Sequence, residues 1–138
     1  MIFVDSNVIL DVMTKDPIWY DWSSETLKKY SEQHRLYINA IIYAEVSINF
    51  SKIEDLNEIL SPEYFEYLPI SVEVAFLAGK IFVQYRRNSG NKQSPLPDFF
   101  VGAHAALLGS SLITRYSKRY RTYFPQVKLI HPELDKGT

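Results

Sequence analysis

Five short apolar runs, separated by longer stretches of helical character, constrain the fold of this chain most strongly. The runs are IFV at residues 2–4, LYI at 36–38, YFEYLPI at 64–70, SLIT at 111–114 and VKLI at 127–130. Short runs rich in branched and aromatic side chains indicate buried strands. Strands that alternate with helices predict a parallel sheet covered on both faces, so we expect an α/β three-layer sandwich with about five central strands.

The stretches between the runs carry the start and stop signals of helices. Helices are expected at residues 6–13, 16–34, 40–50, 53–60, 71–87 and 97–109. Asp5 or Ser6 can cap the first helix and Asn39 the third, whereas Gly109 is suited to end the last. The segment GNKQSPLP at 90–97 is rich in turn-forming residues and predicts a loop.

The size and charge of the chain restrict its organisation and its partners. A chain of 138 residues is expected to form a single domain over residues 1–138. The formal net charge is −1, so only a local basic patch could attract nucleic acid. The absence of cysteine excludes disulfides and thiolate zinc sites and suits a cytoplasmic protein. We expect no membrane partner, because the first residues lack signal-peptide character and no apolar run approaches the roughly 18 residues of a membrane span.

Three acidic residues stand where a parallel sheet binds its ligands, past a strand end or on a facing helix. Asp5 directly follows the first strand, Asp98 lies at the start of a predicted helix, and Glu45 lies within the helical stretch AIIYAEVSINF. Asp5 and Asp98 could simply stabilise helix N-termini. Glu45 has isoleucines on its own face, where a carboxylate needs a cation or basic partner unless it reaches water at the edge of that face.

These three carboxylates together could hold Mg²⁺ or Mn²⁺, which are hard cations that take oxygen ligands. The histidines, His34, His104 and His131, are too widely spaced to form a metal-ligand pattern. His104 is expected to pack or to be half-exposed on its apolar helix. The sequence therefore indicates an acidic metal site.

Four segments, in this order, resemble the PIN-domain ribonucleases, in particular the VapC-like toxins of prokaryotic toxin–antitoxin pairs. They are VDSNVILD at residues 4–11, AEV at 44–46, PDFFVGAHA at 97–105 and LITRYSKRYRTYFP at 112–125. The resemblance implies a PIN-like fold, RNA cleavage that depends on Mg²⁺ or Mn²⁺, a small antitoxin partner and a homodimer. In the family's pattern, Asp5, Glu45 and Asp98 match three catalytic, metal-binding acids, and Asn7 and Thr114 match polar positions beside the metal.

The chain departs from the family's pattern at Tyr116, where the family usually has an aspartate after Thr-Arg. A phenol has a reference pKa near 10 and ligates these hard cations poorly. The difference puts a second metal ion in question. It also leaves open that the chain is a catalytically impaired PIN-like module that binds RNA or protein. A phospho-receiver domain, which also gathers acids beyond a parallel sheet, is disfavoured because YFEYLPIS has no aspartate at the third strand.

A block of cations and tyrosines follows the fourth strand. Arg115, Lys118, Arg119 and Arg121 fall within seven residues. They are expected to bind RNA phosphates at the rim of the acidic site, with simple solvation as the alternative. Tyr116 or Tyr120 could stack on an unpaired base. The later rings, Tyr123 and Phe124, are expected to pack into the protein.

Overall fold

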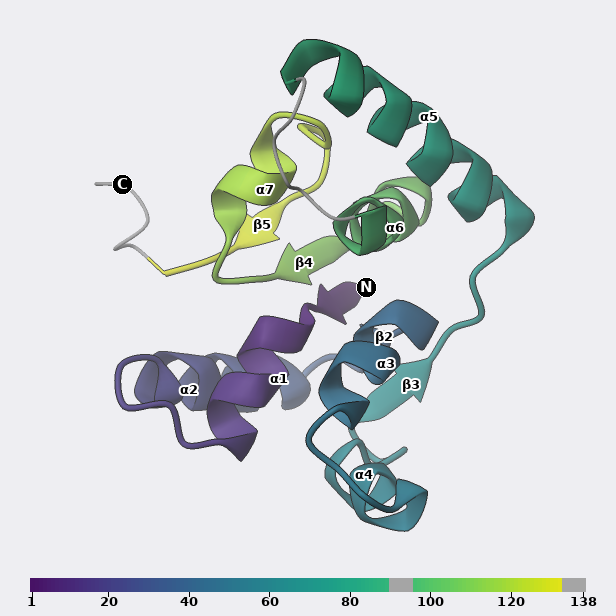
Figure 1. The fold of residues 1–138 in the computed structure, drawn as a ribbon. Coiled ribbons are helices and arrows are strands. Elements are labelled where there is room, and N and C mark those ends of the chain that lie inside the picture. The colour runs from purple at the N-terminus through teal and green to yellow at the C-terminus, as the bar shows by residue number, and fades with distance from the viewer. Residues whose placement is uncertain (90–95, 133–138) are drawn as a thin grey trace.

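The computed structural model describes residues 1–89 and 96–132 and contains one sheet of five parallel strands (Figure 1). The strands are β1 (Ile2–Val4), β2 (Leu36–Ile38), β3 (Phe65–Tyr67), β4 (Ser111–Ile113) and β5 (Leu129–Ile130). Their order in the sheet is β3-β2-β1-β4-β5, and every neighbouring pair is parallel. The predicted number of strands and their parallel arrangement are confirmed.

Seven helices flank this sheet within the described residues. They are α1 (Ser6–Met13), α2 (Tyr20–Ser31), α3 (Ala40–Ser47), α4 (Ile53–Ile59), α5 (Val72–Ser89), α6 (Leu96–Leu107) and α7 (Ser117–Arg121). In Figure 1, α1 packs with α2 on one side of the sheet and α5 packs with α6 on the other. All three residues of β1 are buried, as a central strand covered on both faces requires. The three-layer α/β architecture is therefore confirmed.

Local signals in the sequence explain most helix boundaries. The side chain of Asp5 accepts the Ser6 N–H and caps α1, and that of Asn39 accepts two N–H groups at the start of α3. After α6, Gly109 adopts φ +62°, a left-handed conformation that glycine tolerates best. The side chain of Asp16 accepts the N–H groups of the two residues after Pro17, so that turn precedes α2, which begins only at Tyr20.

Other boundaries differ from the expectations. Helix α2 ends at Ser31 and α3 at Ser47, and β3 and β5 keep only three and two residues of the predicted runs. Helix α7 was not predicted, because five residues are too few to display a helical period. The expected loop at 90–97 lies mostly outside the described residues, and α6 already includes its last two positions.

The C-terminal part of the chain is held by close packing on α6. The ring of Phe124 is buried against Gly102, where a Cβ atom would overlap it. Phe124 also lies 6.1 Å from Phe99, measured between ring centroids. This contact fixes the segment that follows β4 over the helix that carries Asp98. None of the helices in the described part of the chain combines the length and the apolarity needed to cross a bilayer.

Candidate active site

The sheet register brings the ends of β1 and β4 together. Val4 pairs with Ile113, so the next residues, Asp5 and Thr114, emerge side by side at the carboxyl edge of the sheet. Thr114 Oγ1 donates a hydrogen bond of 2.9 Å to Asp5 Oδ2. Two residues separated by 109 positions in the chain are thus direct partners at the expected ligand-binding edge.

Asp5 accepts three hydrogen bonds that fix its orientation. Besides Thr114, the Ser6 N–H donates to Oδ1 at 2.9 Å and the Tyr120 hydroxyl donates to Oδ2 at 2.8 Å. Burial, with the charges of Asp5 and Asp98, raises the pKa of Tyr120 well above its usual range. Tyr120 therefore remains a proton donor to Asp5. The capping interpretation of Asp5 is correct, and the same carboxylate also faces the acidic site.

Glu45 contacts the residue that directly follows Asp5. The Ser6 hydroxyl donates a hydrogen bond of 2.8 Å to Glu45 Oε1, which links α3 to the start of α1. Burial raises the pKa of Glu45, and the negative charge of Asp5 raises it further, although the Ser6 bond and Arg119 oppose the shift. Glu45 is thus a half-buried acid whose charge interacts with that of Asp5.

Asp98 lies in the first turn of α6 and is the acid least satisfied by the protein. Its Oδ2 is buried and has no hydrogen-bond partner among the described residues; Arg119 Nη1 lies 3.5 Å away in an ion pair. Burial raises the pKa of Asp98 to about 6; the cation of Arg119 opposes the shift, and the charges of Asp5 and Glu45 add to it. Each of the three acids therefore affects another, although they come from three separate helix regions.

The three carboxylates do not form a compact ligand set. Within residues 1–89 and 96–132, no group of three Asp, Glu, His or Cys side chains is arranged to hold a metal ion. The donor set still suits Mg²⁺ or Mn²⁺, because these ions prefer oxygen and Mg²⁺ usually takes only one or two carboxylates besides water. The buried, unsatisfied oxygen of Asp98 is the atom that such an ion would satisfy.

Asn7 and Thr114 hold the chain as it leaves β4. Asn7 Oδ1 accepts the Arg115 N–H at 3.0 Å, and Asn7 Nδ2 donates to Thr114 Oγ1 at 3.5 Å. Thr114 Oγ1 also accepts the Tyr116 N–H at 3.0 Å. Both residues thus lie beside the acidic cluster and position the segment that carries the cations.

Arg115 is committed to a structural partner. Its guanidinium donates to both oxygens of Asp11, at 2.6 and 2.9 Å, and only 14% of its side chain is exposed. It also lies over the rings of Trp19 and Tyr116, at 5.1 and 5.0 Å. This geometry favours a structural role for Arg115 over the predicted contact with RNA.

The other three cations of the block are exposed. Arg119 lies over the half-exposed ring of Tyr116, with its Cζ 4.1 Å from the ring centroid. Arg121 donates to Ser117 Oγ at 3.1 Å, and Lys118 faces solvent on the same short helix. Arg119 thus borders the acidic cluster through Asp98, and Lys118 and Arg121 are exposed on the same short helix; these three cations are called the basic edge.

The aromatic residues of this segment differ in their burial. Tyr120 is fully buried, so it cannot stack on a base; its hydroxyl is used by Asp5. Tyr123 lies against the rings of Tyr85 and Phe99, and Phe124 is buried, as expected for packed rings. Tyr116 retains an exposed edge.

His104 is packed in the core, as expected. Its Nδ1 lies 3.0 Å from Asn39 Nδ2, and its ring lies 4.7 Å from that of Phe3. Because an amide nitrogen only donates, Nδ1 must accept, and burial lowers the pKa of His104. This neutral histidine has no role in holding a metal.

Sequence reasoning missed the contacts of three neighbours of the site, namely Ser6, Asp11 and Tyr120. Ser6 was considered only as a helix cap, yet its hydroxyl links two elements through Glu45. Asp11 is buried and is held by Ser23 as well as by Arg115. An aspartate on the buried face of a short helix is a signal that could have identified it.

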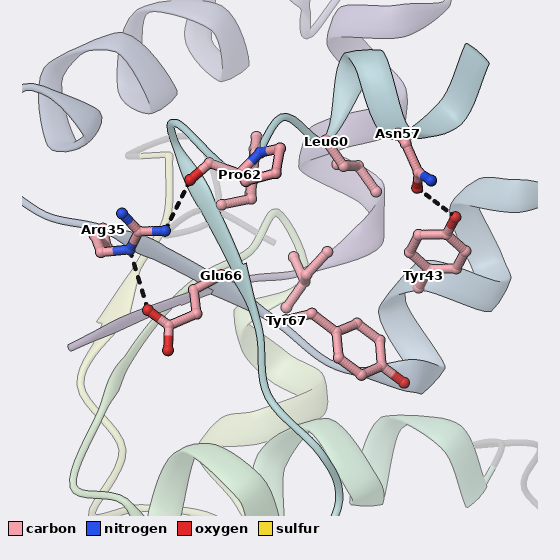
Figure 2. A pocket seen from close by; sticks show the side chains of 9 residues that line it. Arg35, Tyr43, Asn57, Leu60, Pro62, Glu66 and Tyr67 are labelled. Carbon is pink, nitrogen blue, oxygen red and sulfur yellow. Dashed lines mark hydrogen bonds and ion pairs between the residues drawn. The ribbon is translucent and has the colours of Figure 1, made fainter. Parts of the chain in front are cut away.

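A separate cavity lies between β2, β3, α3 and α4 (Figure 2). Its volume is about 550 Å³, and it is lined by Arg35, Ile38, Tyr43, Asn57, Leu60, Pro62, Phe65, Glu66 and Tyr67. The Arg35–Glu66 ion pair and the bond from Tyr43 to Asn57 occupy its polar groups. None of the candidate acids lines this cavity.

The arrangement of these elements matches a known family. The family model described as PIN domain aligns with residues 2–124, which is most of the chain. The chain belongs to the PIN domain family. The first strand, the three acids and the basic segment after β4 all fall inside the matched region of this PIN domain.

Solved structures share the fold of this PIN domain. VapBC2 from Rickettsia felis, bound to a DNA fragment from the promoter, aligns with a TM-score of 0.71 at 19% identity over 95% of this chain and 98% of that chain. A toxin–antitoxin complex from Klebsiella pneumoniae aligns with a TM-score of 0.68 at 22% identity over 96% and 98%. FitAcB from Neisseria gonorrhoeae aligns with a TM-score of 0.68 at 23% identity over the same shares. No curated protein matches the chain in sequence.

Proposed function

We propose that this PIN domain is a metal-dependent endoribonuclease, the toxin component of a toxin–antitoxin pair, and that it hydrolyses RNA phosphodiester bonds. The observation that carries the proposal is the buried Oδ2 of Asp98, which has no hydrogen-bond donor among the described residues and lies near the charges of Asp5 and Glu45. A buried carboxylate is unfavourable unless it is fully compensated, and Arg119 at 3.5 Å compensates Asp98 only in part. A divalent cation would compensate it.

Asp5, Glu45 and Asp98 would hold Mg²⁺ or Mn²⁺, partly through water. When bound, such an ion lowers the pKa of a water molecule and neutralises charge on the phosphate. The protein positions these carboxylates through hydrogen bonds. Tyr120 and Thr114 orient Asp5, and Ser6 orients Glu45. No histidine base is needed, which agrees with the buried, neutral His104.

The RNA would lie along the basic edge, Lys118, Arg119 and Arg121. These cations lie on α7, which directly follows the strand that supplies Thr114. A single strand fits best, because a site at one edge of a sheet must reach one backbone whose bases can be splayed out. The exposed edge of the Tyr116 ring is where such a base would contact an aromatic side chain.

The proposal includes a protein partner, an oligomeric state and a cellular compartment. The similar solved structures are complexes of toxin–antitoxin type, and an acidic site would accept an arginine from a small antitoxin through a paired hydrogen bond. We also propose that the chain acts as a single domain, in a homodimer and in the cytoplasm.

Cleavage of total RNA tests the proposed activity. The purified protein should cut RNA with Mg²⁺ or Mn²⁺ and not with EDTA, and the 5′ ends of the products, once sequenced, should reveal its target. Asp5→Asn is the matched control, because an amide can still cap α1 but carries no charge. Absence of cutting by a folded wild-type protein with either metal would reject the activity.

A second candidate is an RNA- or protein-binding module without catalysis. The observation that favours it is Tyr116 in place of the fourth acid, together with the loose arrangement of the three remaining carboxylates. This candidate would bind RNA equally well with metal and with EDTA and would leave it intact.

A further inference from the structure

The two arginines that flank Tyr116 have different commitments. Arg115 is anchored, because both oxygens of Asp11 accept its guanidinium hydrogen bonds. Arg119, in contrast, has no such anchor. Its Cζ lies 4.1 Å from the centroid of the Tyr116 ring, and 45% of its side chain is exposed. Its only anionic contact among the described residues is Asp98, at 3.5 Å and without a hydrogen bond to Oδ2. The donors of Arg119 are therefore available to another anion.

The charge of Arg119 lies at the edge of the acidic cluster. Its Nη1 is 3.5 Å from the buried Oδ2 of Asp98, for which no hydrogen-bond donor is found among the described residues. The guanidinium thus lies where it can compensate the acidic cluster and still face solvent. Stacking on an aromatic face holds such a group in place, and a cation on a ring is worth about 0.5–1 kcal/mol at exposed sites.

The charges at the acidic site balance if Arg119 is counted with a single divalent ion. Three ionised carboxylates carry −3, and one divalent ion with Arg119 carries +3 (two plus one). An aspartate at position 116 would add a fourth negative charge and a further oxygen ligand, whereas the phenol of Tyr116 supplies neither and instead supports a cation. The chain therefore has positive charge built in at the side of the site where it lacks an acid.

We propose that Arg119, supported by the ring of Tyr116, is a built-in phosphate-binding cation that takes the place of a second metal ion at the acidic site. This inference rests on the proposed nuclease function and assigns a substrate-binding residue to it. The guanidinium would bind an oxygen of the RNA phosphate beside Asp98, with two N–H groups in the fork geometry that suits phosphate. The site would then bind one divalent ion per chain.

Calorimetry with Mn²⁺ and RNA binding in EDTA test this assignment. Arg119→Gln should bind Mn²⁺ roughly fivefold more tightly, since a competing cation is lost at a partly exposed pair. The same variant should lose one phosphate contact, which lowers the slope of log affinity against log salt by about 0.7 on single-stranded RNA. Cleavage at saturating Mn²⁺ should fall.

Matched variants separate charge from position. Arg121→Gln removes the same charge from α7, and it should weaken RNA binding while Mn²⁺ affinity stays unchanged. Tyr116→Phe keeps the aromatic face under Arg119 and should therefore keep the wild-type affinity for Mn²⁺. Tyr116→Leu removes the aromatic face and should reproduce the tighter Mn²⁺ binding of Arg119→Gln in part.

The outcomes distinguish this inference from the nuclease proposal. If the wild type cleaves RNA but Arg119→Gln changes neither Mn²⁺ affinity nor the salt slope, Arg119 is not the phosphate-binding cation and the inference fails alone. A wild-type stoichiometry of two Mn²⁺ ions per chain also overturns it. If the folded wild type binds no Mn²⁺ and cuts no RNA, the nuclease proposal fails first.

Discussion

At the scale of single residues, the surroundings of Asp98 disfavour its ionised form. The folded protein keeps a proton on Asp98 up to a pKa of about 6, whereas the ordinary value is 3.8, because burial and two neighbouring carboxylates disfavour the ion. Between these pH values the folded state binds more protons than the unfolded chain. Raising the pH from about 4 to about 6 therefore lowers the free energy of unfolding. Below about 4, Asp98 is protonated in both the folded and the unfolded state, so pH no longer changes its contribution.

Asp98→Asn should consequently stabilise the metal-free protein at neutral pH. The difference in unfolding free energy between the variant and the wild type should grow as the pH rises from about 4 to about 7, by at most about 3 kcal/mol. Urea denaturation in EDTA at several pH values measures it. The lowered pKa of His104 acts in both proteins and cancels in the difference. A difference that does not vary with pH would mean that Asp98 titrates normally.

Tyr116 is the residue at which a single substitution should change the metal dependence. Tyr116→Asp adds an oxygen ligand beside the acidic cluster, so cleavage should reach its half-maximal rate at a lower Mg²⁺ concentration. The bound ion should outweigh the repulsion among four carboxylates at neutral pH. Metal affinity and RNA affinity should be measured separately, because loss of the ring weakens stacking on a base. No change in either affinity would place Tyr116 outside the site.

At the scale of elements, the contact between α6 and the chain after α7 depends on one missing side chain. A Cβ atom at Gly102 would overlap the buried ring of Phe124. Because Tyr120 lies one turn before Phe124, displacement of this ring also disturbs the hydroxyl that binds Asp5. Packing at Gly102 thus supports the orientation of a site residue.

Gly102→Ala should therefore destabilise the protein by about 1–3 kcal/mol, as overpacking does in a dense core. Gly79→Ala is the matched control on α5, where a Cβ would meet nothing within 4 Å. That control should stabilise by about 0.5–1 kcal/mol, because alanine favours a helix. Denaturant midpoints measure both. Equal effects of the two substitutions would show that the Phe124 ring moves aside at little cost.

At the scale of the whole molecule, the protein is nearly neutral but has a basic edge beside an acidic centre. The net charge is −1, and Lys118, Arg119 and Arg121 lie together on α7. Affinity for RNA should therefore come from few phosphate contacts. Lys118→Ala with Arg121→Ala should lower the log–log salt slope of RNA binding by about 1.4, that is roughly 0.7 for each lost contact. An unchanged slope in a salt titration would assign these two cations to solvation or to a protein partner.

The sequence alone was sufficient for the architecture and for the place of two site residues at the sheet edge. The five-stranded parallel sheet follows from alternating periodicities, which are local properties of short windows. Asp5 and Thr114 could be placed at the sheet edge because each directly follows a strand. The order of motifs then indicated the PIN domain, which the family match confirms.

Only the tertiary structure decided which side chains are committed and which are available. Arg115 binds Asp11 across 104 positions, and Tyr120 binds Asp5 across 115. Such pairs depend on how α1, α7 and the sheet edge pack, and no local pattern encodes that packing. The same packing buries Tyr120 and leaves Tyr116 and Arg119 exposed, although these residues are close in sequence. The buried Tyr120 thus directly follows Arg119, one member of the proposed phosphate-binding pair.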